Sequence, residues 1–196
     1  MVDIGAYGQQ SDGSVFAHST FAKLMMQGRL DLPPNRPLRG EQEPVPLVFV
    51  GDEAFPLKRH LLRPFPGSDF GPSSRVYDFR LSHARRVVEN AFGIMVSRFR
   101  DFRRPIAVSA ERAESVVKAC TVLRNLLRDD YGETESGSSD LDTHEFVDTD
   151  PALQPLGRRS GREAVEAMEV CSAFMRHFNS PQGSPPWQEE RVNRVS

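Results

Sequence analysis

Val45-Pro46-Leu47-Val48-Phe49-Val50 is an apolar run that ends directly at Gly51-Asp52-Glu53. A short apolar run closed by glycine is typical of a buried strand, so we expect a strand here with Asp52 at its end. Strand ends in a mixed sheet face the crevice where ligands bind, which places an acid there well for a metal. The alternative interpretation is that Gly51-Asp52 only opens a turn.

The second informative stretch is Arg85-Arg86-Val87-Val88-Glu89-Asn90-Ala91-Phe92-Gly93, within a region of helical periodicity. We predict a helix over Leu81–Phe102, capped by Ser82, because apolar residues repeat there with the spacing of one buried face. The residues of that face are Val88, Ala91, Phe92, Met95 and Phe99. Glu89 stands beside it, and a partly buried carboxylate must be paired or bind a metal. An i,i+4 salt bridge to Arg85 is the alternative.

Charge is distributed unevenly along the chain, although the net charge is only −2. Residues 57–104 carry eleven Lys and Arg against four acids, whereas residues 129–150 carry nine acids and no Lys or Arg. Only the first block could hold a polyanion such as DNA. Its candidate DNA-binding residues are Arg85, Arg86, Arg98, Arg100, Arg103 and Arg104. A solvated helix surface is the alternative for the same arginines.

Composition excludes several classes of protein. The 196 residues allow one ordinary domain with tails, and 15 prolines indicate long irregular segments. The two isolated cysteines favour buried thiols in a reducing compartment over a disulfide framework. Neither a zinc-site histidine spacing, nor a glycine-rich nucleotide loop, nor a nucleophile elbow occurs in the sequence. No apolar run is long enough to span a membrane, and no secretory signal is visible.

The remaining patterns divide the chain into three parts. Residues 1–128 hold the strand, the helix and two further predicted helices, over 15–26 with a cap at Ser19-Thr20 and over 109–128 with a cap at Ser109. Residues 129–160 form an acidic linker that we expect to be disordered, because it has too little apolar surface to offset its ordering entropy. Residues 161–196 hold a predicted helix over 161–178 and a tail. Asp12-Gly13 is predicted to form a turn, and residues 64–74 a loop.

These stretches together resemble the DDE endonuclease domain of PIF/Harbinger-type transposases and of the nucleases domesticated from them. Val48–Leu57 resembles the family's second-aspartate block, and Tyr77–Ile94, continuing through Arg98-Phe99-Arg100, resembles its glutamate block. Weaker matches are Gly8–Gly13, Ala119–Asn125 and the Pro186-Trp187-Gln188 ending.

The resemblance implies an α/β architecture of the ribonuclease-H-like type, a mixed sheet with flanking helices. It implies Asp52 and Glu89 as catalytic metal ligands, with Asp12 as a third ligand of the metal. The cation would be Mg²⁺ or Mn²⁺, and the reaction hydrolysis and strand transfer at DNA phosphodiesters. It further implies DNA as partner, a separate Myb-like DNA-binding protein, and a location in the nucleus, with the cytoplasm as a second location.

The chain also departs from the family pattern. The family's first catalytic aspartate and its helix-turn-helix region would lie upstream of residue 1, so residues 1–128 resemble the C-terminal part of the domain. Arg124 stands where histidine is common, and Asp78 where asparagine is common. We therefore expect weak metal binding and poor or absent cleavage from this chain alone.

Three functions stay open at this point. The first is a metal-dependent DNA endonuclease or transposase-like enzyme, and the second is a non-catalytic DNA- or protein-binding remnant of a domesticated transposase. The third is a degenerate product without activity. Metal dependence separates the first from the others, because only an enzyme of this type needs Asp52 and Glu89 as ligands.

Overall fold

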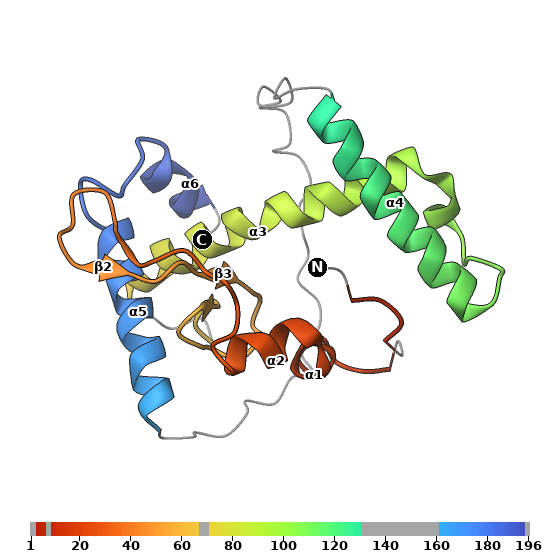
Figure 1. Cartoon of the computed structure of the whole chain (residues 1–196). Helices are drawn as coiled ribbons and strands as arrows, with labels where there is room; N and C mark the ends of the chain where they lie inside the picture. The colour runs from red at the N-terminus through yellow and green to blue at the C-terminus, as the bar shows by residue number, and fades with distance from the viewer. Residues whose placement is uncertain (1–2, 7–8, 67–70, 131–160, 195–196) are drawn as a thin grey trace. The chain divides into compact units, whose positions relative to one another are not determined.

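The computed structural model describes residues 3–6, 9–66, 71–130 and 161–194. Contacts divide the chain into two compact units: unit 1 is Met1–Ala6 with Asn90–Leu156, and unit 2 is Tyr7–Glu89 with Gly157–Ser196 (Figure 1). The helix that begins after Gly161 belongs to the same unit as residues 7–89. The predicted division into residues 1–128, 129–160 and 161–196 stays a prediction. The predicted acidic linker lies outside the described residues, apart from Asp129 and Asp130.

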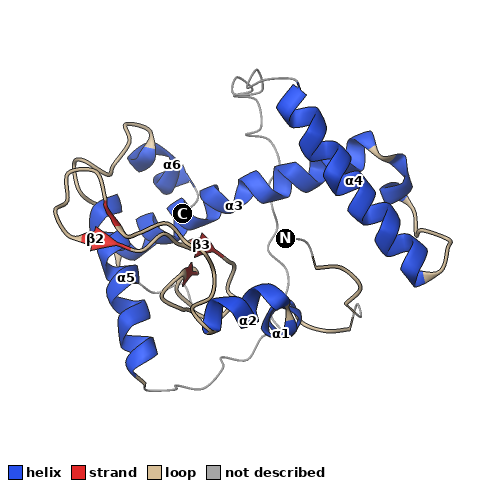
Figure 2. Ribbon diagram, in the orientation of Figure 1, coloured by secondary structure: helices blue, strands red, loops and turns tan. Residues whose placement is uncertain are grey.

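Helices dominate the described residues (Figure 2). They are α1 Asp12–His18, α2 Thr20–Met26, α3 Pro72–Arg98, the 3-10 helix η1 Arg100–Arg103, α4 Ala110–Asp130, α5 Arg162–Phe178 and α6 Gln188–Arg194. The strands are short: β1 Arg36–Pro37, β2 Pro44–Val45, β3 Phe49–Val50 and β4 Leu61–Leu62. None of the described helices is both long and apolar enough to cross a membrane.

The described strands form two separate two-stranded sheets. β1 pairs antiparallel with β2, and β3 pairs parallel with β4. This helix-rich arrangement with short strands is consistent with the α/β class. The predicted single strand over residues 45–50 is wrong, since only its two ends pair. Prolines 44 and 46 lack the N–H that a strand donates to its neighbour, which limits pairing at this point.

Serine caps set the start of both N-terminal helices. Ser11 Oγ accepts a hydrogen bond from Ser14 N at 3.3 Å, so α1 begins at Asp12 and the predicted Asp12-Gly13 turn is wrong. Ser19 is the N-cap of α2, as predicted, and separates two helices where one was expected.

Helix α3 begins nine residues earlier than predicted, at Pro72 rather than Leu81. Proline is favoured in the first helical turn because its missing N–H is one that the helix leaves unpaired there. Ser82 therefore lies inside the helix and does not cap it. The helix ends at Arg98, where Phe99 adopts an extended conformation before η1.

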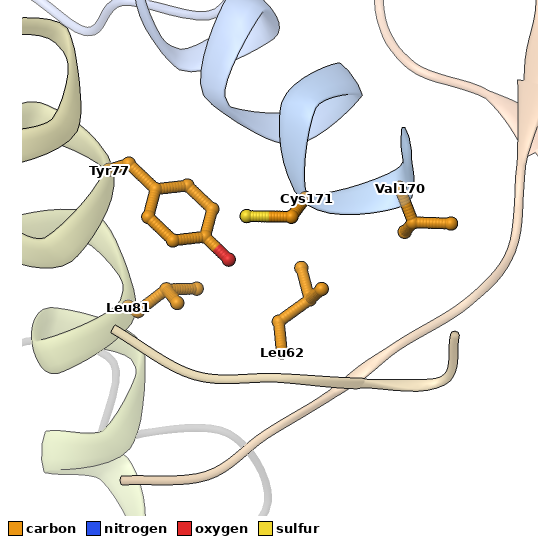
Figure 3. Close-up of a cluster of buried hydrophobic side chains, with 5 residues drawn as sticks. All are labelled: Leu62, Tyr77, Leu81, Val170 and Cys171. Carbon is orange, nitrogen blue, oxygen red and sulfur yellow. The ribbon is translucent and has the colours of Figure 1, made fainter. Parts of the chain in front are cut away.

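The core of unit 2 joins β4, α3 and α5 (Figure 3). Its buried side chains are Leu62, Tyr77, Leu81, Val170 and Cys171. Figure 3 shows the side chains of Tyr77 and Leu81, one helical turn apart on α3, beside those of Cys171 and Leu62. Burial raises the pKa of the Tyr77 hydroxyl, and this hydroxyl donates to Arg63 O at 3.4 Å.

The apolar face predicted for α3 is mostly not the one that is buried. Met95 is buried, but the side chains of Val88 and Phe92 are 57% and 59% exposed. The spacing correctly predicted a helix, but the α3 side chains that lie in the core of unit 2 are those of Tyr77 and Leu81.

The segment after Pro181 is ordered rather than a tail. Arg80 Nη1 donates to Gly183 O at 3.1 Å and to Gln188 Oε1 at 2.9 Å. The same guanidinium lies 4.6 Å from the ring centroid of Phe178 and 5.7 Å from that of Trp187. These contacts hold the start of α6 on α3.

In unit 1, α4 begins at Ala110, directly after the predicted cap Ser109, and extends to Asp130. Cys120 is buried on this helix, and burial raises the pKa of its thiol. Leu123 and Leu126 on the same helix are exposed.

Candidate functional site

Asp52 follows β3 in a turn, and one of its two carboxylate oxygens is held there by a hydrogen bond. Gly51 N donates to Leu62 O at 2.8 Å, which extends the pairing of β3 with β4. A Cβ on Gly51 would lie 2.9 Å from Cβ of Phe55, so glycine permits the tight turn. Asp52 Oδ1 accepts from Ala54 N at 2.9 Å. Asp52 therefore stands at the end of β3 and opens a turn, and its role as a metal ligand stays a prediction.

Glu89 lies on α3 and shares a partner with Asp52. Arg85 Nη2 is 3.4 Å from Glu89 Oε1 and 3.6 Å from Asp52 Oδ2. The i,i+4 salt bridge considered as the alternative for Glu89 is therefore present, and it includes the acid of the preceding loop. The three side chains are partly exposed: Arg85 30%, Asp52 32% and Glu89 43%. Two carboxylates far apart in the sequence thus converge on one nitrogen atom.

Asp12 lies near the turn that holds Asp52, because the next residue, Gly13, packs against that turn. It is exposed in the first turn of α1, and a Cβ on Gly13 would lie 2.5 Å from Ala54 O. The start of α1 therefore packs against the Asp52 turn. Within residues 3–6, 9–66, 71–130 and 161–194, however, no group of three or more His, Cys, Asp or Glu could hold a metal ion. The third ligand stays a prediction.

The donor set of the pair fits a hard divalent cation. Mg²⁺ is bound through one or two carboxylates, with water and substrate phosphates completing its octahedron, and does not need an all-protein cage. Asp52 Oδ2 and Glu89 Oε1 can supply these oxygens, and the Arg85 guanidinium already places a positive charge beside both. A bound cation would polarise a phosphoryl oxygen and lower the pKa of a coordinated water.

The six candidate DNA-binding arginines are divided between the two units. Arg85 and Arg86 belong to unit 2 with the carboxylates. The other four belong to unit 1, at the end of α3 and around η1, and all four are exposed: Arg98, Arg100, Arg103 and Arg104. Arg103 Nη2 donates to Ser97 O at 3.4 Å. Exposed guanidinium groups of this kind can contact phosphates without base specificity.

Comparison with known proteins decides the family. The family model described as DDE superfamily endonuclease matches residues 1–125, more than half of the chain. The chain belongs to the DDE superfamily of endonucleases. No curated protein and no solved structure gave a significant match. Asp12, Asp52, Glu89 and all six arginines lie inside the matched DDE segment, whereas α5 and α6 lie outside it.

In this DDE endonuclease, contacts of Arg63, which the sequence did not single out, and of Asp78 tie the segment after β4 to α3. Arg63 Nη1 donates to Glu53 O at 2.7 Å, and its own carbonyl accepts from Tyr77. Asp78 Oδ1 accepts from Phe65 N at 2.9 Å. The only signal in the sequence was that Asp78 stands where the family commonly has asparagine. The side chains of aspartate and asparagine can both accept a hydrogen bond from an N–H.

Proposed function

We propose that this chain is a divalent-metal-dependent nuclease acting on DNA phosphodiesters, with Asp52 and Glu89 as the metal ligands. The observation that carries the proposal is the convergence of these two carboxylates on a single cationic atom, Arg85 Nη2. Membership of the DDE superfamily supports metal-dependent phosphodiester chemistry as the reaction class.

Each residue has a distinct part in this proposal. The hydrogen bond from Ala54 N holds Asp52 Oδ1, which leaves Oδ2, the oxygen beside Arg85 Nη2, able to bind the cation. Glu89 comes from the long helix α3, whose backbone fixes its position. Asp12, on the adjoining α1, would complete the ligand set if the start of α1 moved toward the pair. The exposed arginines around η1 would neutralise backbone phosphates.

The finer assignments rest on the sequence blocks quoted above. We place the protein in the PIF/Harbinger subtype, with a ribonuclease-H-like core, a nuclear location and a Myb-like partner. Expression of a fluorescent fusion would test the location, and co-purification with candidate Myb-like proteins would test the partner.

Titration calorimetry with Mn²⁺ and Mg²⁺ tests the ligand pair directly. Asp52→Asn/Glu89→Gln should weaken binding at least about tenfold, because it removes both carboxylate ligands. The matched control is Asp31→Asn/Glu169→Gln, which removes one aspartate and one glutamate at exposed positions of unit 2. Equal binding by the two double variants would contradict the proposal.

A second candidate function is favoured by the charge balance of the site. Because Arg85 already pairs both acids and no third acid joins them among the described residues, the chain could bind DNA or a protein without catalysis. In that case DNA affinity would be independent of metal. It would fall in Arg98→Ala, Arg100→Ala or Arg103→Ala, with a shallower salt dependence for each lost phosphate contact.

A further inference from the structure

Arg85 Nη2 contacts both of the carboxylates that we propose as metal ligands. Arg85 Nη2 is 3.6 Å from Asp52 Oδ2 and 3.4 Å from Glu89 Oε1, so the distance between these two oxygens is at most the sum of the two values. A bound Mg²⁺ would have to approach each of these oxygens to about 2.1 Å. The cation and the guanidinium nitrogen cannot share this space, and their positive charges repel each other.

The arginine is held weakly enough to be displaced. All three side chains are partly exposed, and ion pairs at such positions contribute little net free energy because water competes for the charges. Displacement by another cation is therefore the means of release that the geometry provides.

We propose that Arg85 is the resident counter-ion of the Asp52–Glu89 pair and competes with the divalent metal for it. This inference rests on the proposed function, because it takes the pair to be the metal site. In the absence of metal, Arg85 holds the two carboxylates together and offsets their mutual repulsion. Metal binding then requires the guanidinium to leave both oxygens, which lowers the apparent metal affinity.

Removal of the arginine should therefore improve metal binding. In a calorimetric titration, Arg85→Gln is expected to bind Mn²⁺ about three- to tenfold more tightly than the wild-type chain does. This factor corresponds to the free energy of the two partly exposed ion pairs that metal binding breaks in the wild-type chain. The control is Arg75→Gln, which removes the same charge from an exposed position on α3, about 15 Å earlier along the helix axis. It should leave the affinity unchanged within about twofold.

Thermal unfolding gives a second readout. Without metal, Arg85→Gln should melt below the wild-type chain, because it leaves two neighbouring carboxylates unneutralised. With the same saturating Mn²⁺ concentration, its melting temperature should rise by more than that of the wild-type chain, since stabilisation by a ligand grows with the logarithm of the ratio of its concentration to Kd. A salt bridge with only a structural role would not be replaced by Mn²⁺ in this way.

The Asp52→Asn/Glu89→Gln protein separates failure of this inference from failure of the proposed function. If wild-type binding is lost in that double variant but Arg85→Gln binds Mn²⁺ no more tightly than wild type, the metal site stands and the competition is refuted. If none of the three proteins binds metal, both proposals are overturned. Tighter binding in Arg85→Gln but not in Arg75→Gln supports the competition.

Discussion

Asp78 is a half-buried acid on α3 whose charge is poorly solvated. Burial raises the pKa of its carboxyl above the ordinary value of 3.8, and the charge of Glu53 adds to the shift, while the hydrogen bond from Phe65 N opposes it. Between the unfolded pKa and the higher folded pKa, the folded state binds more protons than the unfolded state. Stability therefore falls as the pH rises through this interval.

Asp78→Asn should raise the melting temperature at pH 7. The amide can still accept from Phe65 N but does not need to bury a charge at this position. The advantage over wild type should shrink as the pH is lowered toward 4, because protonation then neutralises the wild-type carboxyl as well. Melting curves between pH 4 and 8 measure this, and a difference that is the same at every pH would contradict the assignment.

At the scale of elements, Ser19 closes one helix and opens the next. Its Oγ accepts from Ala22 N at 3.0 Å and donates to Phe16 O at 2.6 Å, at a buried position between α1 and α2. Ser11 caps α1 through one longer hydrogen bond, of 3.3 Å, at an exposed position. The two serines thus make the same kind of contact with different burial.

Ser19→Ala should lower the free energy of unfolding by about 1–2 kcal/mol, and Ser11→Ala by about 0.5 kcal/mol. The difference arises because Ser19→Ala leaves two backbone groups without their side-chain partner, and water reaches the exposed end of α1 more easily. Urea titrations of both variants provide the comparison. A larger loss for Ser11→Ala would show that the α1–α2 corner does not depend on Ser19.

The caps also show what a sequence can predict. Ser19 acts locally, within three residues of the helix that it begins, so the sequence alone predicted its position. The exposure of Val88 and Phe92 could not be predicted in this way, since helical spacing does not say which turns another element covers. The Asp52–Arg85–Glu89 contact lies between these cases. The i,i+4 pairing of Arg85 with Glu89 was one of the two interpretations of the sequence, but the contact of Arg85 with Asp52 depends on how a distant loop packs on α3.

At the scale of the whole molecule, unit 2 depends on residues outside the segment that matches the DDE family. Leu62, Tyr77 and Leu81 come from the matched segment, and Val170 and Cys171 come from α5. Two further contacts join α5 to the loop before β4: Lys58 Nζ lies 3.0 Å from Glu163 Oε2, and Arg59 lies 4.0 Å from Glu166. The surface on which Asp52 and Glu89 are held is therefore supported from beyond the family segment.

Shortened chains test this dependence in two steps. A chain of residues 1–180 keeps α5 but loses the Trp187 and Gln188 contacts to Arg80, so it should lose about 1–3 kcal/mol of unfolding free energy while still unfolding cooperatively.

A chain of residues 1–156 also loses Val170 and Cys171, which uncovers Leu62 and Tyr77, and should show no cooperative urea transition for unit 2. Adding residues 157–196 as a separate peptide should restore part of the near-ultraviolet circular dichroism of Tyr77. If the 1–156 chain unfolds like the full chain, α5 does not form part of the core, and the site is supported by the DDE segment alone.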